Sequence, residues 1–169
     1  MNWSGSKVLV TGGASFIGSH LVDALVARGA SVRVADDLSS GRLANLDQSI
    51  GQVEFMQGDL RERSFADRAT AGMQVVFHLA ASHGGRGYID THPVECATNM
   101  ILDGTVFNSA WQAGVERIAF ASSACVYPTT LQAEQQIAQG GMVYLQEPWA
   151  DPFVPGAALA DGEYGWAKL

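Results

Sequence analysis

The sequence predicts an α/β fold in which helices cover both faces of one parallel sheet. Short apolar runs of strand length recur between Lys7 and Ala121, segments with helical spacing separate them, and glycines stand at several of the joins. Alternation of strand and helix implies crossover connections, so the strands run parallel and their carboxyl ends meet at one edge. In doubly wound sheets, ligands bind at that edge.

Five apolar runs are predicted to be the strands of this sheet. They are Lys7–Thr11, Ser31–Ala35, Val53–Met56, Val75–Leu79 and Arg117–Ala121. The first is followed by apolar residues at helical spacing, which predict a helix over Phe16–Arg28. Gly29 stands in the usual helix-stop position after it.

The second half of the chain contains a predicted long helix and a predicted long loop. Apolar residues at helical spacing indicate one continuous helix over Val94–Ala113. Residues 129–160 are rich in Gln, Gly and Pro and show no clear period, so we predict a long loop with a short helix at Leu131–Gln139. A loop of this length in a compact domain is usually functional.

Composition restricts the class of protein. A chain of 169 residues fits one domain, so we expect a single domain over residues 1–169. The net charge of −7 argues against nucleic acid or an anionic membrane as a partner, because both require clustered Lys and Arg. No run approaches the ~20 apolar residues of a membrane span, and no signal peptide is visible at the start. We therefore expect a cytoplasmic protein.

Cysteines and histidines are few and show no zinc spacing. Cys96 and Cys125 are too few for a disulfide framework, and we predict no metal site. Among the four histidines, His20 and His78 lie in positions that we expect to face the core. His83 precedes a glycine cluster and is a candidate for lining a substrate site.

The segment between the first strand and the first helix reads Thr-Gly-Gly-Ala-Ser-Phe-Ile-Gly over residues 11–18. Glycines there allow a tight turn and a close approach of backbone N–H groups to a pyrophosphate. Asp36 follows 18 residues later at the end of the second strand, where a carboxylate binds ribose hydroxyls and favours NAD over NADP. The alternative is an ordinary glycine-rich turn. The predicted cofactor contacts here are Gly12, Gly13, Ser15, Phe16, Ile17, Gly18 and Asp36.

These residues resemble the extended short-chain dehydrogenase/reductase family, whose Rossmann-type domain opens with Thr-Gly-x-x-Gly-x-x-Gly. Ser15 stands where the family has its middle glycine, so we expect a weakened phosphate turn. Further matches are Gly-Asp-Leu after the third strand, His-Leu-Ala-Ala after the fourth, and an asparagine in the long helix. The resemblance implies NAD contacts from Asp59, Leu60, Leu79, Ala80, Ala81 and Asn99.

Two later segments resemble the family's catalytic residues. Ser123 matches the catalytic serine, and Tyr164 with Lys168 matches the Tyr-x-x-x-Lys pair, which also contacts NAD. The resemblance implies that the tyrosine takes a sugar hydroxyl proton while the hydride passes to NAD. A tyrosine pKa of ~10 would have to fall by ~3 units for this, and a lysine four residues later on the same helix face favours the phenolate.

The closest resemblance is to the GDP-mannose 3,5-epimerase subfamily, through Gly-Gly-Arg-Gly-Tyr-Ile at residues 84–89 and Ser-Ser-Ala-Cys-Val-Tyr-Pro at 122–128. There the cysteine, here Cys125, acts as an acid/base that inverts a sugar carbon. The alternative is a small buried hydrophobe. Gly85 and Arg86 are candidates for substrate binding, with a solvated arginine as the equal alternative.

The resemblance implies an NAD-dependent nucleotide-sugar epimerase that forms a transient keto-sugar. A 4,6-dehydratase is the nearest alternative, but its usual Thr-Asp-Glu is absent at the serine segment. A non-catalytic NAD-binding module or inactive fragment is the alternative of another class. Family members continue into a C-terminal substrate region, so we expect NAD binding but little turnover from these 169 residues alone. The helix near residues 94–113 is a candidate homodimer interface by analogy.

Overall fold

The computed structural model describes residues 2–127, 160 and 162–169, which divide into two compact units. The first unit runs to Ala81 and also takes Ile101–Ala121. The second takes Ser82–Met100 and the described residues from Ser122 onward. The predicted loop over 129–160, apart from Ala160, lies outside the described residues, as does the short helix predicted within it.

A five-stranded parallel sheet forms the centre of the first unit. Its strands are β1 (Lys7–Thr11), β2 (Ser31–Asp36), β3 (Val53–Gln57), β4 (Val75–His78) and β5 (Arg117–Phe120). The strand order is β3-β2-β1-β4-β5, with every neighbouring pair parallel. The chain moves outward from β1 to β3 and then returns to the other side of β1, so the order reverses between β1 and β4. The carboxyl edge at such a reversal is where these sheets bind ligands.

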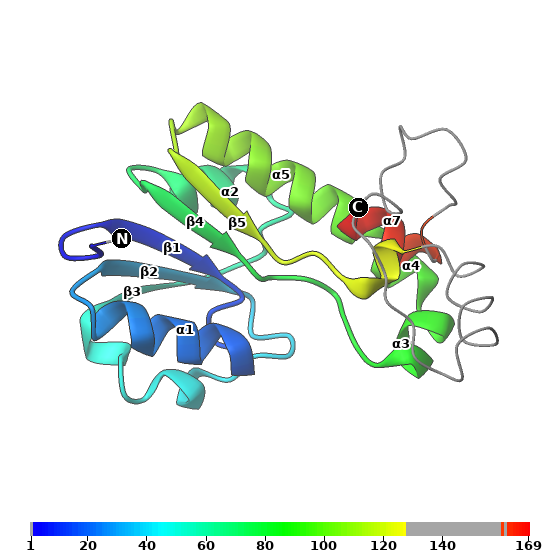
Figure 1. Cartoon of the computed structure of the whole chain (residues 1–169), viewed down its shortest axis with the longest axis horizontal. Coiled ribbons are helices and arrows are strands. Elements are labelled where there is room, and N and C mark those ends of the chain that lie inside the picture. Colours follow the sequence, from blue (N-terminus) through cyan, green and yellow to red (C-terminus); the bar gives the residue numbers. More distant parts are fainter. Residues whose placement is uncertain (1, 128–159, 161) are drawn as a thin grey trace, which may run out of the picture. The chain divides into compact units, whose positions relative to one another are not determined.

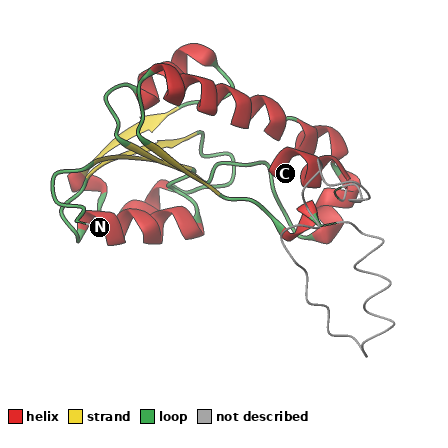
Figure 2. Cartoon of the chain, turned by 45° about the horizontal axis from the view of Figure 1, so that its top comes forward, coloured by secondary structure: helices red, strands yellow, loops and turns green. Residues whose placement is uncertain are grey.

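Helices cover both faces of this sheet, which confirms the predicted fold class (Figures 1 and 2). Helix α1 (Phe16–Val26) lies on one face, whereas α2 (Arg63–Thr70) and α5 (Asn99–Gln112) lie on the other. The sequence pattern had not indicated helix α2. Two short 3-10 turns, η1 (Leu43–Leu46) and η2 (Ile50–Gln52), precede β3.

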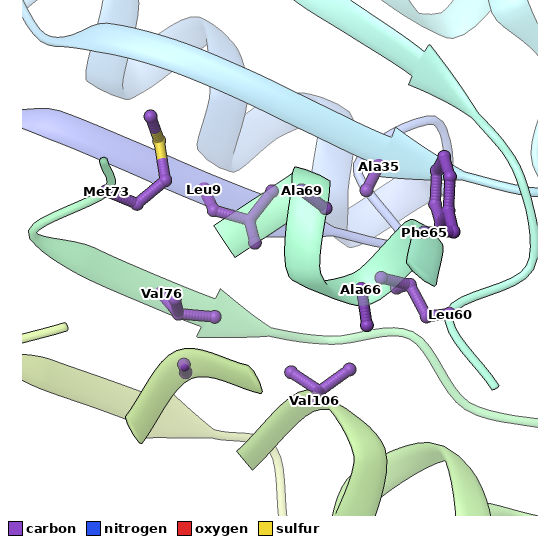
Figure 3. Close-up of a cluster of buried hydrophobic side chains, with 10 residues drawn as sticks. Leu9, Ala35, Leu60, Phe65, Ala66, Ala69, Met73, Val76 and Val106 are labelled. Carbon is purple, nitrogen blue, oxygen red and sulfur yellow. The ribbon is translucent and has the colours of Figure 1, made fainter. Parts of the chain in front are cut away.

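The sheet separates two apolar layers because neighbouring strand residues point to opposite faces. Val8 and Val10 of β1 pack with Val22 and Leu25 of α1 on one side. Leu9, between the two valines, points to the other layer. Figure 3 shows that second layer, in which residues of α2 and α5 meet the sheet. It comprises Leu9, Ala35, Leu60, Phe65, Ala66, Ala69, Met73, Val76, Val106 and Ala110.

The described elements of the second unit are short helices. They are α3 (Arg86–Thr91), α4 (Pro93–Ala97), the 3-10 turn η3 (Ala124–Val126) and α7 (Gly162–Lys168), together with the start of α5. The prediction of one continuous helix over 94–113 is wrong, because Thr98 separates α4 from α5. The Thr98 hydroxyl donates to the Glu95 carbonyl oxygen at 2.6 Å, a local bond that competes with helical pairing.

The two histidines expected in the core differ in their surroundings. His78 is fully buried, as predicted. His20 is exposed on α1, where its Nδ1 lies 2.8 Å from the Phe16 carbonyl oxygen one turn earlier, so the expectation for His20 is wrong. No helix in the described part of the chain is long and apolar enough to cross a membrane.

Candidate cofactor and catalytic site

The turn between β1 and α1 has room for glycine alone at its two ends. Gly12 has a φ of +66°, and a Cβ there would lie 2.9 Å from the backbone nitrogen of Ala80. A Cβ on Gly18 would lie 2.7 Å from the Cα of Gly13 and collide with the Gly12 carbonyl oxygen. Both contacts are with backbone, which cannot move aside as a side chain can. The turn is therefore drawn tightly against both the helix start and the segment after β4.

Ser15 closes this turn and caps the helix. Its hydroxyl donates to the Gly12 carbonyl oxygen at 2.6 Å and accepts from the backbone N–H of Gly18 at 3.3 Å. A serine at an N-cap satisfies one of the helix N–H groups that lack a carbonyl partner. The N–H groups of Phe16 and Ile17, in the first turn of this 11-residue helix, have no carbonyl partner within the helix. Such a helix start attracts an anion, which fits the pyrophosphate of a dinucleotide.

Asp36 joins the glycine turn to the end of β2. The residue is 6% exposed, and its carboxylate accepts from the backbone N–H groups of Ala14 and Leu38, both at 2.9 Å. Gly41 lies so close that a Cβ there would be 2.9 Å from the carboxylate. Each carboxylate oxygen keeps a lone pair for a further donor such as a ribose hydroxyl. The carboxylate is thus held in a fixed orientation beside the turn.

Asp59 and Leu60 follow β3. The Arg61 guanidinium, which hydrogen-bonds the Asp59 carboxylate at 2.7–3.0 Å, holds the pKa of that carboxyl below its ordinary value. Leu60 is buried in the apolar layer beneath α2. The Leu60 side chain therefore anchors the loop in the apolar core. The Asp59 side chain and the backbone of this loop are the groups that can face a ligand.

Leu79, Ala80 and Ala81 follow β4 and are all partly exposed. The Thr11 hydroxyl accepts from the backbone N–H groups of Leu79 and Ala80, both at 3.1 Å. This hydroxyl continues the pairing of β1 with β4 beyond the last residues of the strand ladder. The segment is consequently fixed directly beside Gly12, at the reversal of strand order.

Asn99 is 1% exposed, and its side-chain amide forms two hydrogen bonds with the backbone of a single residue, Ser82. It accepts from the Ser82 N–H at 2.7 Å and donates to the Ser82 carbonyl oxygen at 2.9 Å. The paired bonds imitate a strand contact and hold the chain just after Ala81. Asn99 thereby shapes the loop that begins there.

Gly85 and Arg86 lie at the start of α3. Gly85 is the N-cap residue, and Arg86 is the first helical residue. A Cβ on neighbouring Gly84 would lie 2.5 Å from the Cβ of Tyr88, so this turn too requires glycine. The Tyr88 hydroxyl lies 3.2 Å from the Ser82 hydroxyl, which links α3 to the loop that Asn99 holds.

Ser123 and Cys125 lie at η3, after the last strand. The Ser123 hydroxyl accepts from the backbone N–H of Cys125 at 3.2 Å, and this bond caps the short turn. The Cys125 side chain is partly exposed. Ser123 and Cys125 therefore belong to one hydrogen-bonded turn.

Helix α7 packs directly on this turn. The Ser122 hydroxyl donates to the Lys168 carbonyl oxygen at 2.7 Å, and a Cβ on Gly165 would collide with the Cys125 carbonyl oxygen. Tyr164 and Lys168 are four residues apart and so share one face of the helix. Lys168 is 2% exposed and Tyr164 is partly exposed. The second unit thus brings all four predicted catalytic residues together.

The sequence of this chain matches one family over most of its length. Residues 8–150 match the NAD dependent epimerase/dehydratase family. The chain belongs to this family. Among its relatives, UDP-glucose 4-epimerase of Mycolicibacterium smegmatis is 37% identical over 69% of this chain and 38% of its own length. GDP-mannose 3,5-epimerase 1 of Oryza sativa subsp. japonica is 32% identical over 96% of this chain and 40% of its own length.

Solved structures of family members share the fold. The complex of UDP-glucose 4-epimerase from Thermus thermophilus with NAD superposes with a TM-score of 0.68 at 27% identity. The match covers 95% of this chain and 47% of that one. The chain therefore spans about two fifths of the length of the two sequence relatives and under half of that structure.

Three residues of this epimerase/dehydratase chain support its site but were not identified from the sequence. Ser122 holds α7, Ser82 pairs with the asparagine of α5, and Asp103 is a carboxylate with 4% exposure on α5. Of these three residues, only Asp103 could have been noticed in the sequence, because it is an acidic residue on the side of α5 that faces the sheet. Within the described residues, no group of three or more His, Cys, Asp or Glu side chains could hold a metal ion.

Proposed function

We propose that this chain binds NAD and takes part in the epimerisation of a nucleotide sugar through a transient keto-sugar. The observation that carries the proposal is the contact between α7 and η3, where the Ser122–Lys168 hydrogen bond and the close approach at Gly165 gather the predicted catalytic residues. Membership of the NAD dependent epimerase/dehydratase family supports the same chemistry.

The cofactor site proposed for NAD is the carboxyl edge of the sheet. The first turn of α1 would hold the pyrophosphate through the N–H groups of Phe16 and Ile17, and Asp36 would accept from the adenosine ribose hydroxyls. A 2′-phosphate at that position would be repelled by the carboxylate, which favours NAD over NADP. When bound, NAD supplies a reversible hydride acceptor for the sugar carbon.

Proton transfer falls to the residues of η3 and α7. Tyr164 would take the proton from a sugar hydroxyl, and Ser123 would hydrogen-bond the same hydroxyl and orient it. The buried ammonium of Lys168, on the same helix face, favours the phenolate form of the tyrosine. The resulting keto-sugar has acidic C–H bonds beside its carbonyl.

We further propose that Cys125 exchanges protons with one of those C–H bonds. A cysteine thiol can both give and take a proton in general acid/base catalysis. Cys125 is partly exposed and lies two residues from Ser123 in the same turn, which supports a role for both side chains on one bound sugar. Inversion of a ring carbon beside the keto group would use such a group, and one relative of this chain is named GDP-mannose 3,5-epimerase 1.

The proposed partners are a nucleotide sugar and a second copy of the chain. Gly85 and Arg86, at the start of α3, are the proposed sugar contacts. Exposed apolar side chains on α5, Ile101 at 58% and Trp111 at 77%, support a homodimer through that helix.

Solvent deuterium tests the proposal and separates two kinds of epimerase. Because little turnover is expected from these 169 residues alone, the protein is used at a concentration comparable to that of the sugar and over a long incubation. It is incubated with NAD and GDP-mannose in D₂O, and the sugar is analysed by NMR. Inversion beside a keto group exchanges a C–H bond with solvent, whereas inversion at the oxidised carbon itself returns the same hydrogen. We expect deuterium at the inverted ring carbons of GDP-mannose. UDP-galactose formed from UDP-glucose without deuterium would instead support a 4-epimerase.

Two cysteine variants provide the matched comparison. Cys125→Ala should abolish deuterium incorporation, whereas Cys96→Ala, which alters a buried thiol in α4, should retain it. Deuterium incorporation by Cys125→Ala at the wild-type rate would contradict the acid/base role. Absence of both exchange and interconversion, with either sugar and with NAD bound, would contradict the proposed epimerase activity.

A further inference from the structure

We propose, on the basis of the NAD binding proposed above, that Asp103, His78 and Thr11 form a buried hydrogen-bonded chain that positions the cofactor edge of the sheet. In this chain His78 is a neutral imidazole held in the tautomer with its proton on Nε2. The three residues act as positioning residues, because they support the backbone that would touch the cofactor.

The three side chains connect two strands and a helix of the first unit. His78, the last residue of β4, pairs in register with Thr11, the last residue of β1. The His78 Nδ1 lies 2.7 Å from the Thr11 hydroxyl oxygen, and its Nε2 lies 2.9 Å from a carboxylate oxygen of Asp103 on α5. Thr11 and His78 are fully buried, and Asp103 is 4% exposed.

The hydrogen-bonding capacity of the Thr11 hydroxyl decides where the histidine proton lies. The hydroxyl accepts from the N–H groups of Leu79 and Ala80, which occupies its lone pairs. Its single proton must then be donated, and the acceptor within reach is the Nδ1 of His78. Nδ1 therefore carries no proton, and Nε2–H donates to the Asp103 carboxylate.

Aromatic rings shield the hydrogen-bonded side chains of Asp103, His78 and Thr11 from water. The Phe107 ring meets the His78 ring edge-on with centroids 5.6 Å apart, and the Phe120 ring stacks on it at 5.8 Å. In such apolar surroundings each hydrogen bond is stronger than in water, and an unpaired polar group is costly. Loss of the Thr11 hydroxyl would therefore remove one hydrogen-bond partner each from the Leu79 N–H, the Ala80 N–H and the His78 Nδ1.

Thr11, at one end of the three hydrogen-bonded side chains, supports the backbone where the strand order reverses. Leu79 and Ala80 lie past the last β1–β4 pair, so the Thr11 hydroxyl is the partner that holds their N–H groups. This sets the close approach of Ala80 to Gly12, whose Cβ would lie 2.9 Å from the Ala80 nitrogen. Both segments are proposed cofactor contacts. The separation of these two segments would thus depend on Thr11.

Substitutions at Thr11 test this role, with Thr70 as the matched control. Thr11→Val keeps the shape and removes the hydroxyl, whereas Thr11→Ser keeps the hydroxyl. Thr70→Val removes an equally buried threonine hydroxyl that donates to Ala66 within α2, away from the cofactor edge. NAD affinity is measured by calorimetry and folding by thermal unfolding. We expect Thr11→Val to weaken NAD binding about tenfold or more, and Thr11→Ser and Thr70→Val to stay within about threefold of wild type.

The tautomer is tested without cofactor. Substitution of the other three histidines, His20→Gln, His83→Gln and His92→Gln, leaves His78 as the sole histidine. Its ring nitrogens are then identified in a long-range proton–nitrogen NMR spectrum. We expect a protonated Nε2 and an unprotonated Nδ1, with the Nδ1 signal changed by Thr11→Val and little affected by Thr70→Val. A protonated Nδ1 would overturn the proposed chain.

The outcomes separate this role from NAD binding itself. If the wild type binds NAD and folded Thr11→Val binds it equally well, the positioning role is refuted while the proposed function stands. If Thr11→Val and Thr70→Val weaken binding equally, Thr11 is merely structural and the positioning role is again refuted. If the wild type itself does not bind NAD, the proposed function fails and the positioning role fails with it.

Discussion

Gly18 is the position at which a single methyl group should do most damage to the site. An alanine Cβ there would lie 2.7 Å from the Gly13 Cα, about 0.7 Å inside ordinary van der Waals contact, and closer still to the Gly12 carbonyl oxygen. Alanine would favour the helix by up to ~1 kcal/mol, but crowding of backbone against backbone costs about 1–3 kcal/mol or more. We expect the crowding to exceed the helix gain, so Gly18→Ala should lower the free energy of unfolding by about 1–2 kcal/mol.

The same displacement should weaken NAD binding. Helix α1 can relieve the contact only by moving its first turn away from Gly12 and Gly13, which withdraws the N–H groups proposed to hold the pyrophosphate. We expect the dissociation constant for NAD to rise about tenfold, equivalent to ~1.4 kcal/mol. Urea unfolding gives the stability, and calorimetry with the folded variant gives the affinity.

Gly104→Ala is the matched control for this substitution. Gly104 lies in α5 with no atom within 4 Å of its added Cβ, so alanine there should raise stability by up to ~1 kcal/mol and leave NAD affinity unchanged. If Gly18→Ala were as stable as Gly104→Ala and bound NAD like the wild type, the tight approach of α1 to the turn would be refuted.

Three further predictions concern titratable or reactive side chains. Asp36→Asn turns an amide toward two backbone N–H groups, so it should cost about 1–3 kcal/mol of stability and relax the preference for NAD over NADP, measured by unfolding and by paired titrations. Because Arg61 lowers the Asp59 pKa, the pair stabilises the fold above the unfolded-state pKa of aspartate and loses that effect as pH falls through the lower folded value. Arg61→Gln should therefore raise the Asp59 pKa seen by NMR and cost under ~1 kcal/mol at neutral pH only; an unchanged pKa would contradict the pairing. Burial raises the Cys96 pKa, so alkylation followed by mass spectrometry should modify Cys125 first; faster labelling of Cys96 would contradict its burial.

Local patterns in the sequence were sufficient for the central sheet. The five apolar runs became the five strands with ends that differ by at most one residue, because each run is short and contains the β-branched or aromatic residues that favour strands. Helix α2 was not predicted because Arg63–Thr70 has only eight residues and a polar outer face. The break between α4 and α5 at Thr98 was not predicted, because the helical spacing of apolar residues continues across it.

The predicted site residues were more readily located than explained. The glycine motif indicated that Gly12 and Gly18 were needed, but not that Ala80 and Gly13 would be the neighbours that exclude a Cβ. Asn99 was recognised as a motif residue, whereas its paired bonds to Ser82 join residues that no periodicity connects.

The sequence by itself determined the fold class, the family and the positions of the glycine turn and the Tyr-x-x-x-Lys pair, since each depends on the order and spacing of neighbouring residues. Only the tertiary structure decided which groups meet across the chain. The Thr11 hydroxyl reaches His78 across two parallel strands, and the Ser122 hydroxyl reaches the last helix. These contacts join residues that are 46 and 67 positions apart in the sequence. They depend on where the strands end and how the helices pack, which the order of neighbouring residues does not specify.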